Sequence, residues 1–244
     1  MAAFRIVPVV DVKNGRAVHA IKGHRDAYAP VNCSWCNDGD FISLVRGYKE
    51  IFGLHDLYVA DLDAIMVRKP NKVLYRETLT LVDGDLMIDA GISSIGEFHE
   101  LASIGIKNLI LGTESIPNFS LLANIIEQSK HAAIVSLDVK DGALISPAKQ
   151  LAGLKIHEAF QVIERLGPAA IIFLDMSAVG ARTGINSIAK KLAAKATIPL
   201  YLGGGVSSVS DIRVARAAGF AGVLVATALQ AGLISPDEVA RVVA

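Results

Sequence analysis

Eight short runs of apolar residues recur along this chain, and no other feature constrains its fold as strongly. Each run is bounded by turn-forming residues and is nearly continuous in Val, Ile and Leu, which is typical of parallel strands covered on both faces. Segments with helical spacing separate the runs, and one of them, residues 208–219, closes on Gly219, where a helix C-cap favours glycine. The runs span residues 4–12, 56–65, 85–92, 108–114, 132–139, 169–176, 199–206 and 222–229.

Eight strands alternating with helices in 244 residues predict an α/β fold, specifically a (β/α)8 TIM barrel that forms a single domain over residues 1–244. A doubly wound parallel sheet is the alternative, although six strands would suit it better than eight. No linker or low-complexity tract interrupts the alternation.

The chain also repeats itself, because MIDAGISSIG (87–96) reads like YLGGGVSSVS (201–210). Asp11 and Asp138, each followed by Val-Lys, also correspond but lie 127 residues apart. The extra residues are expected in a long loop after the first strand. The repeat predicts two half-barrels, about 1–127 and 128–244. Three pairs share an offset of 114 residues: Gly91 and Gly205, Thr113 and Thr227, and Asp61 and Asp175.

The composition argues against several classes of partner. Twenty-four basic and 24 acidic residues give no net charge, so neither a nucleic acid nor an anionic membrane surface is expected. No apolar run approaches the roughly 20 residues of a membrane span, and the first residues lack a signal peptide's layout. Two cysteines give no disulfide framework, which predicts a cytoplasmic location.

Glycines at strand ends predict binding of phosphate, because they let backbone N–H groups approach an anion beside a helix N-terminus. In barrels the loops after strands 7 and 8 commonly form such a site. The candidates there are Gly203, Gly204, Gly205, Ala226 and Thr227. By the repeat, a second site would use Gly91, Ser93, Gly112 and Thr113, with Asp61 and Asp175 as further contacts at the mouth.

The alternative is that these residues form tight turns with N-capping serines. It weighs more for the first copy, where Asp89 and Ala90 replace two glycines, since a carboxylate repels phosphate.

Asp11 and Asp138 are the candidate catalytic residues. They end strands 1 and 5, on opposite sides of the predicted mouth, and two facing carboxyls can act as acid and base if one stays protonated. The alternative is that each aspartate only caps its following loop. Their equivalent places in the repeat favour a functional pair.

Four motifs, VVDVKNGRAVHAIKG (9–23), VADLDAI (59–65), VSLDVKDG (135–142) and LGGGVSS (202–208), resemble the histidine-biosynthesis barrels. These are the phosphoribosylformimino-aminoimidazole carboxamide ribotide isomerase and the cyclase subunit of imidazole glycerol phosphate synthase, and the resemblance covers essentially the whole chain. It implies that Asp11 is a general base and Asp138 a general acid. The implied substrate is a bisphosphate, and the implied reaction is an Amadori rearrangement of an aminoaldose to an aminoketose.

The two members of the family predict different partners. Ser136, VADLDAI and LGTESI (111–116) are similar to the isomerase, whereas Arg5 and DVKNGR (11–16) are similar to the cyclase. A cyclase would need ammonia from a glutaminase partner, for which the chain has no segment. Neither a cofactor nor a metal is expected.

Three departures predict a divergent branch of the family. Val179-Gly180-Ala181 stands where Asp-Gly-Thr is usual, Asp89-Ala90-Gly91 replaces Gly-Gly-Gly, and LISPAKQ (144–150) lacks a usual Trp. A different phosphorylated substrate, for example in one-carbon or methanopterin-type cofactor metabolism, and a non-catalytic phosphosugar-binding barrel are therefore alternatives.

Smaller signals concern the loops. Arg25, beside His24 and Asp26, is a candidate phosphate contact, and Arg182 with Thr183 could replace contacts of the missing turn. Cys33 and Cys36 form a lone C-x-x-C pair, either by coincidence or as a disulfide that locks the first loop.

Overall fold

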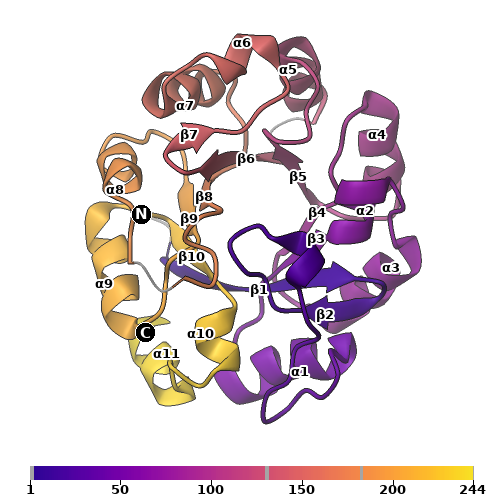
Figure 1. The fold of residues 1–244 in the computed structure, drawn as a ribbon, viewed down its shortest axis with the longest axis vertical. Coiled ribbons are helices and arrows are strands. Elements are labelled where there is room, and N and C mark those ends of the chain that lie inside the picture. Colours follow the sequence, from indigo (N-terminus) through magenta and orange to yellow (C-terminus); the bar gives the residue numbers. More distant parts are fainter. Residues whose placement is uncertain (1–2, 130–131, 182–183, 244) are drawn as a thin grey trace.

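Eight parallel strands form a closed barrel in the computed structural model, which describes residues 3–129, 132–181 and 184–243 (Figure 1). The last strand pairs with the first, with Val7 opposite Leu224, so the sheet has no open edge in the ring. The predicted (β/α)8 barrel is confirmed. In ring order the strands are β1 (Arg5–Lys13), β3 (Leu57–Asp61), β4 (Leu86–Asp89), β5 (Asn108–Gly112), β6 (Ala133–Lys140), β8 (Ala170–Asp175), β9 (Leu200–Gly203) and β10 (Gly222–Val225).

The helices that surround the barrel begin and end at recognisable caps. Asp40, Ser94 and Ser208 each accept a hydrogen bond from a backbone N–H of the first turn, and Gly53 and Gly219 end their helices with left-handed backbone. The outer helices are α1 (Phe41–Phe52), α3 (Lys72–Leu81), α4 (Ile95–Ser103), α5 (Phe119–Gln128), α7 (Ile156–Arg165), α8 (Ser187–Ala193), α9 (Val209–Ala218) and α11 (Pro236–Val243). Short turns of helix lie in the connections: η1 (Arg25–Ala27), α2 (Leu62–Val67), α6 (Lys149–Ala152) and α10 (Thr227–Gln230).

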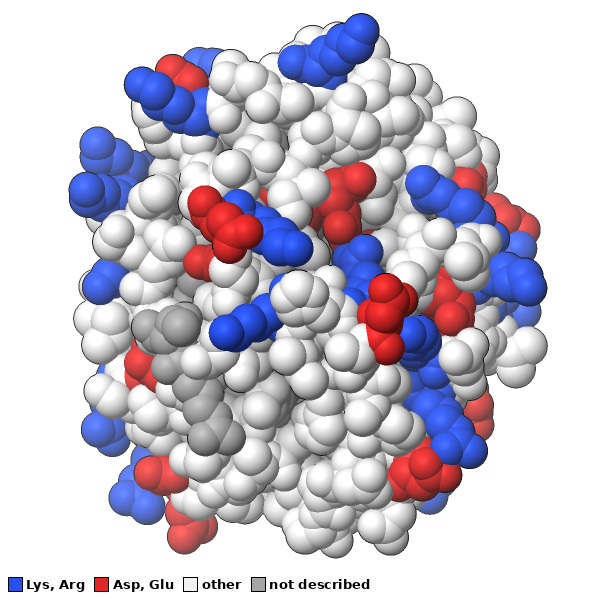
Figure 2. Space-filling model, viewed as in Figure 1, with Lys and Arg blue, Asp and Glu red and all other residues white. Residues whose placement is uncertain are grey.

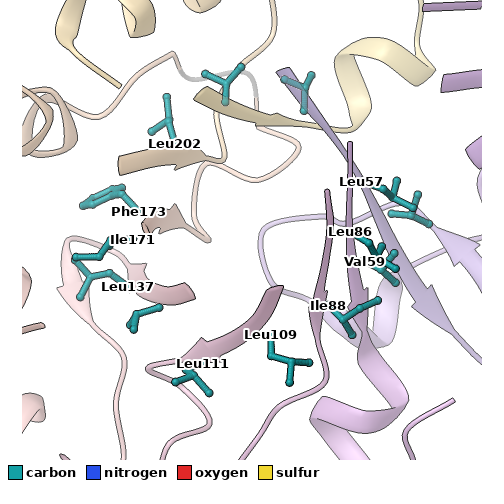
Figure 3. Close-up of a cluster of buried hydrophobic side chains, with 14 of the residues drawn as sticks. Leu57, Val59, Leu86, Ile88, Leu109, Leu111, Leu137, Ile171, Phe173 and Leu202 are labelled. Atoms are coloured by element: carbon teal, nitrogen blue, oxygen red, sulfur yellow. The ribbon is translucent and has the colours of Figure 1, made fainter. Parts of the chain in front are cut away.

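Strand residues alternate between two cores, because successive side chains point to opposite faces of a strand. On β3, Leu57 and Val59 pack outward against the helices, while Tyr58 and Ala60 point into the barrel. Figure 3 shows part of the outer cluster, to which all eight strands of the ring contribute. The inner cluster fills the barrel below its mouth with Val7, Tyr58, Met87, Ile110, Ile134, Ile172, Tyr201 and Leu224, among others.

Two hairpins mark equivalent places in the two halves. β2 (Arg16–Val18) pairs antiparallel with β1, and β7 (Ala143–Leu144) pairs antiparallel with β6. Both turns use two residues with positive φ, Asn14-Gly15 and Asp141-Gly142, as a type I′ turn requires. Asp11 and Asp138 therefore each lie three residues before the first residue of matching hairpin turns.

A long loop between β2 and α1 extends over the mouth of the barrel, and η1 lies in front of the ring in the view of Figure 1. The indole of Trp35 anchors this loop on α1, edge to face with Phe52 and packed against Gly47. On the opposite side, the Lys22 N–H donates to the Val179 carbonyl. No helix within the described part of the chain is long and apolar enough to cross a membrane.

Candidate active site

A pocket opens at the carboxyl ends of the barrel strands, where parallel barrels carry their sites. Its walls enclose about 1020 Å³ of space, part of it open to solvent. Among the described residues, every strand of the ring except β5 and β6 contributes to the wall directly, and the loop after β5 adds Glu114. The polar and charged residues that line it are Asp11, Arg25, Tyr28, Tyr58, Asp89, Glu114, Ser207 and Thr227.

Asp11 reaches the pocket because it shares the inward face of β1 with Val7 and Val9. Burial raises the pKa of this carboxyl to about 7; Arg25 lowers it and Asp89 raises it. A carboxyl with such a pKa can gain or lose a proton near neutral pH, as a general base must.

Asp138 faces inward from β6 but is buried, and it lies outside the pocket lining that the described residues form. Three groups donate to its carboxyl: the Ser136 hydroxyl at 2.6 Å, the Glu114 N–H at 2.9 Å and the Thr113 hydroxyl at 3.2 Å. Burial raises the pKa of Asp138 above its ordinary range, and the Glu114 carboxylate raises it further. Burial and Glu114 thus favour the protonated form of Asp138, whereas the hydrogen bonds from Ser136 and Glu114 lower its pKa. The carboxyl lies behind the pocket wall.

Glu114 and Arg25 form an ion pair at the mouth, and both line the pocket. Arg25 comes from η1, where the Lys13 ammonium donates to its carbonyl at 2.8 Å. Sequence reasoning named Arg25 as a phosphate contact but missed Glu114. The internal repeat could have identified Glu114. Its equivalent 114 positions later is Ala228, so the carboxylate is present in the first copy alone.

The loops after β9 and β10 supply the predicted second-half residues to the pocket: Gly203, Gly204, Gly205, Ala226 and Thr227 all line it. Gly204 and Gly205 have φ of 88° and 83°, and a Cβ on either would lie 2.4 Å from a carbonyl oxygen. Only glycine fits these positions, so the backbone itself forms this wall.

The corresponding first-half residues lie outside the pocket lining that the described residues form: Gly91, Ser93, Gly112 and Thr113. The Gly91 N–H donates to Asp89 at 3.0 Å, and the Ser93 N–H and hydroxyl donate to Glu97. Asp89 lines the pocket in their place, with the Tyr58 hydroxyl donating to it at 3.2 Å. Burial raises the pKa of Asp89 to about 6, so the group is mostly ionised at neutral pH.

Asp61 and Asp175 organise their own loops. Asp61 is fully buried, caps α2 at Ala64 and accepts from the Tyr75 hydroxyl at 2.5 Å. Asp175 accepts from the Ser177 N–H and from Asn186. Neither is part of the pocket lining formed by the described residues, whereas the predicted contacts Arg182 and Thr183 lie outside the described residues.

Cys33 and Cys36 are free thiols joined through their backbones, with reciprocal N–H to carbonyl bonds of 2.8 and 3.2 Å across a two-residue turn. Within the described ranges, no three His, Cys, Asp or Glu residues are grouped to hold a metal ion.

Comparison with known proteins identifies relatives of this chain. A family model described as "Histidine biosynthesis protein" matches residues 5–235. A 1-(5-phosphoribosyl)-5-((5-phosphoribosylamino)methylideneamino)imidazole-4-carboxamide isomerase of Natronomonas pharaonis is 29% identical over 245 residues, covering 99% of both chains. The isomerase of the same name from Halobacterium salinarum is 29% identical over 233 residues, 94% of this chain and 93% of its own. An uncharacterized protein of Methanocaldococcus jannaschii is also 29% identical, over 96% of this chain and 97% of its own.

Proposed function

The chain belongs to the histidine biosynthesis protein family, and on that premise we propose that it is an isomerase that converts a phosphorylated aminoaldose into an aminoketose. The observation that carries the proposal is a pair of carboxyls whose pKa values are raised by burial: Asp11 and Asp138 lie near the carboxyl ends of equivalent strands, β1 and β6. Relatives named as isomerases of a phosphoribosylamino compound support the reaction class.

The proposed reaction needs one proton donor and one proton acceptor. An acid protonates the ring oxygen of the aminoaldose, the ring opens, and the nitrogen lone pair forms a C1=N iminium. A base then removes the proton from C2, which gives an enolamine. Protonation at C1 and ketonisation at C2 yield the aminoketose, so the two carboxyls end with the protons they began with.

Asp11 is the proposed base, because it lines the pocket and ionises near neutral pH. Asp138 is the proposed acid, because burial and the nearby Glu114 carboxylate raise its pKa and favour its protonated form. Its proton reaches the substrate once the Glu114 side chain, now held by Arg25 at the mouth, moves aside.

The glycine wall after β9 is the proposed phosphate contact. Gly203, Gly204 and Gly205 bring backbone to the pocket surface without side chains, and Thr227 of the next loop adds a hydroxyl. A phosphate held here would place the sugar over the barrel axis, toward Asp11.

Complementation of an isomerase-null histidine auxotroph tests the proposal. We expect growth with the wild-type chain and with Asp26→Asn, an exposed carboxylate of η1 that serves as the matched control. Asp11→Asn and Asp138→Asn should each abolish growth at equal protein levels. If the wild type fails, proton exchange at C2 of phosphorylated aminoaldoses in D2O tests the same chemistry on other substrates. Exchange that survives both substitutions would overturn the assignment.

A phosphosugar-binding barrel without turnover is the second candidate. Three hydrogen bonds to the buried Asp138 carboxyl favour this second candidate, because an acid fixed behind Glu114 could not transfer a proton to a substrate in the pocket. This candidate predicts phosphosugar binding with no C2 exchange, a result that the D2O experiment distinguishes directly.

A further inference from the structure

The two half-barrels present opposite chemistry to the pocket at positions that the repeat makes equivalent. Asp89 of β4 corresponds to Gly203 of β9, and Glu114 after β5 corresponds to Ala228 after β10, each 114 residues apart. All four residues line the pocket. One wall therefore carries two carboxylates where the other carries a glycine and an alanine.

The helix N-termini do not cause this difference. Ser93 donates through its N–H and hydroxyl to Glu97 of α4, and Ser207 donates in the same way to Asp211 of α9. Both helices cap themselves with their own carboxylate. The contrast between the walls rests on the strand ends alone.

The first-half wall has little to offer a second phosphate. Of the side chains that the structure describes in the lining, Arg25 is the one cation, and it is already paired with Glu114. The Gly91 N–H, which could have met an anion, donates to Asp89, and the Gly91 carbonyl accepts from Arg68. Asp11, Asp89 and Glu114 together outweigh the single Arg25. Figure 2 shows the mouth face with acidic and basic side chains interspersed rather than gathered into a basic patch.

We infer that the pocket takes a substrate with one phosphate, held at the β9 and β10 loops, and that the other end of the substrate carries an amine or a similar hydrogen-bond donor. This inference rests on the proposed function, since it names the substrate class of that site. It replaces the bisphosphate implied by the sequence resemblance. The carboxylate oxygens of Asp89 and Glu114 are acceptors, so they suit N–H or ammonium groups and repel a phosphate dianion.

A crystal structure after soaking with inorganic phosphate shows how many anions the pocket binds. We expect one phosphate, at Gly203–Gly205 and Thr227. A second phosphate beside Asp89 and Glu114 would overturn the inference while leaving the proposed function standing. Absence of phosphate from both walls would overturn the proposed function as well.

Calorimetric titration with three sugar phosphates measures whether the pocket prefers an amine or a second phosphate at the far end of the ligand. We expect glucosamine 6-phosphate to bind more tightly than glucose 6-phosphate, and fructose 1,6-bisphosphate to bind at least tenfold more weakly than glucosamine 6-phosphate. The double variant Asp89→Gly/Glu114→Ala copies the second-half residues onto the first half. In this variant the dissociation constant of fructose 1,6-bisphosphate should fall to within about threefold of that of glucosamine 6-phosphate, or below it.

The matched control is Glu77→Gln/Glu127→Gln, which removes two exposed carboxylates from α3 and α5. It should leave the order of affinities for the three probes unchanged. Tighter binding of the bisphosphate than of the amine by the wild type would contradict the inference. So would an unchanged order in the folded Asp89→Gly/Glu114→Ala variant.

Discussion

Arg25 in η1 forms an ion pair with Glu114 after β5, and the pair joins the long first loop to the loop after β5. Beneath it the Glu114 N–H donates to Asp138, so one residue contacts both the loop and the buried acid. Arg25 also lowers the pKa of Asp11, whereas Glu114 raises that of Asp138. The pair therefore acts on both members of the proposed acid–base couple, in opposite directions.

Asp89→Asn should make stability less dependent on pH. The pKa of Asp89 is 3.8 for an ordinary aspartate and about 6 in the folded chain, so the folded state binds this proton more tightly. The stabilisation is complete below about pH 4 and is lost as the pH rises through about 6, by on the order of 2 to 3 kcal/mol. Urea unfolding at about pH 4 and about pH 7 measures the difference. The wild type should lose more stability than the variant, and equal losses would contradict the assignment; Glu77→Gln is the control.

Gly47→Ala should destabilise the protein, against the usual rule for a helix. Alanine normally stabilises an open helix position by up to about 1 kcal/mol relative to glycine. A Cβ on Gly47, however, would lie 1.9 Å from the indole of Trp35, so either the ring or the loop must move. We expect a loss of about 1 to 3 kcal/mol in urea unfolding.

Gly96→Ala in α4 is the matched control for that substitution, because a Cβ there would meet only the Ser94 hydroxyl at 4.0 Å. It should be neutral or stabilising. A Gly47→Ala variant as stable as Gly96→Ala would show that Trp35 does not anchor the loop on α1.

The barrel could be predicted because its signals are local. Apolar runs without a polar face indicate strands buried on both sides, and all eight predicted runs correspond to strands of the ring. The glycines after β9 were predictable for the same reason, since a left-handed backbone at Gly204 and Gly205 is a property of those residues themselves.

The placement of Asp138 could not be predicted, because it depends on contacts between distant loops. The strand pattern shows that Asp138 points inward, as Asp11 does, but not that Thr113 and Glu114, from the loop after β5, donate hydrogen bonds to it. Asp61 and Asp175 were likewise ambiguous, because an aspartate at a strand end can face a ligand or cap the next helix. Their partners, Tyr75 and Asn186, lie 14 and 11 residues further along the chain.

Cys33 and Cys36 should differ in reactivity and stay unlinked. Burial raises the pKa of the Cys36 thiol to about 11, and its sulfur faces the Asp40 carbonyl at 3.3 Å, so little thiolate forms near neutral pH. Cys33 is partly exposed. Iodoacetamide labelling followed by mass spectrometry should modify Cys33 first, and Cys36 only on unfolding. Equal labelling, or loss of both thiols to a disulfide in the purified protein, would contradict this.

Arg25→Ala and Glu114→Gln should move the pH profile of kcat/KM in opposite directions on its acidic side. The proposed base Asp11 must be ionised, so activity rises with pH through about 7, and it falls again when Asp138 loses its proton. Removing Arg25 removes a charge that lowers the pKa of Asp11, and the acidic limb should move up by roughly one pH unit. Glu114→Gln frees Arg25 to act on Asp11 and lowers the pKa of Asp138, so both limbs should move down. Arg25→Lys keeps the charge and should hold the acidic limb near its wild-type position.

Shifts of the same sign in Arg25→Ala and Glu114→Gln would show that the ion pair does not set the ionisation of the two aspartates.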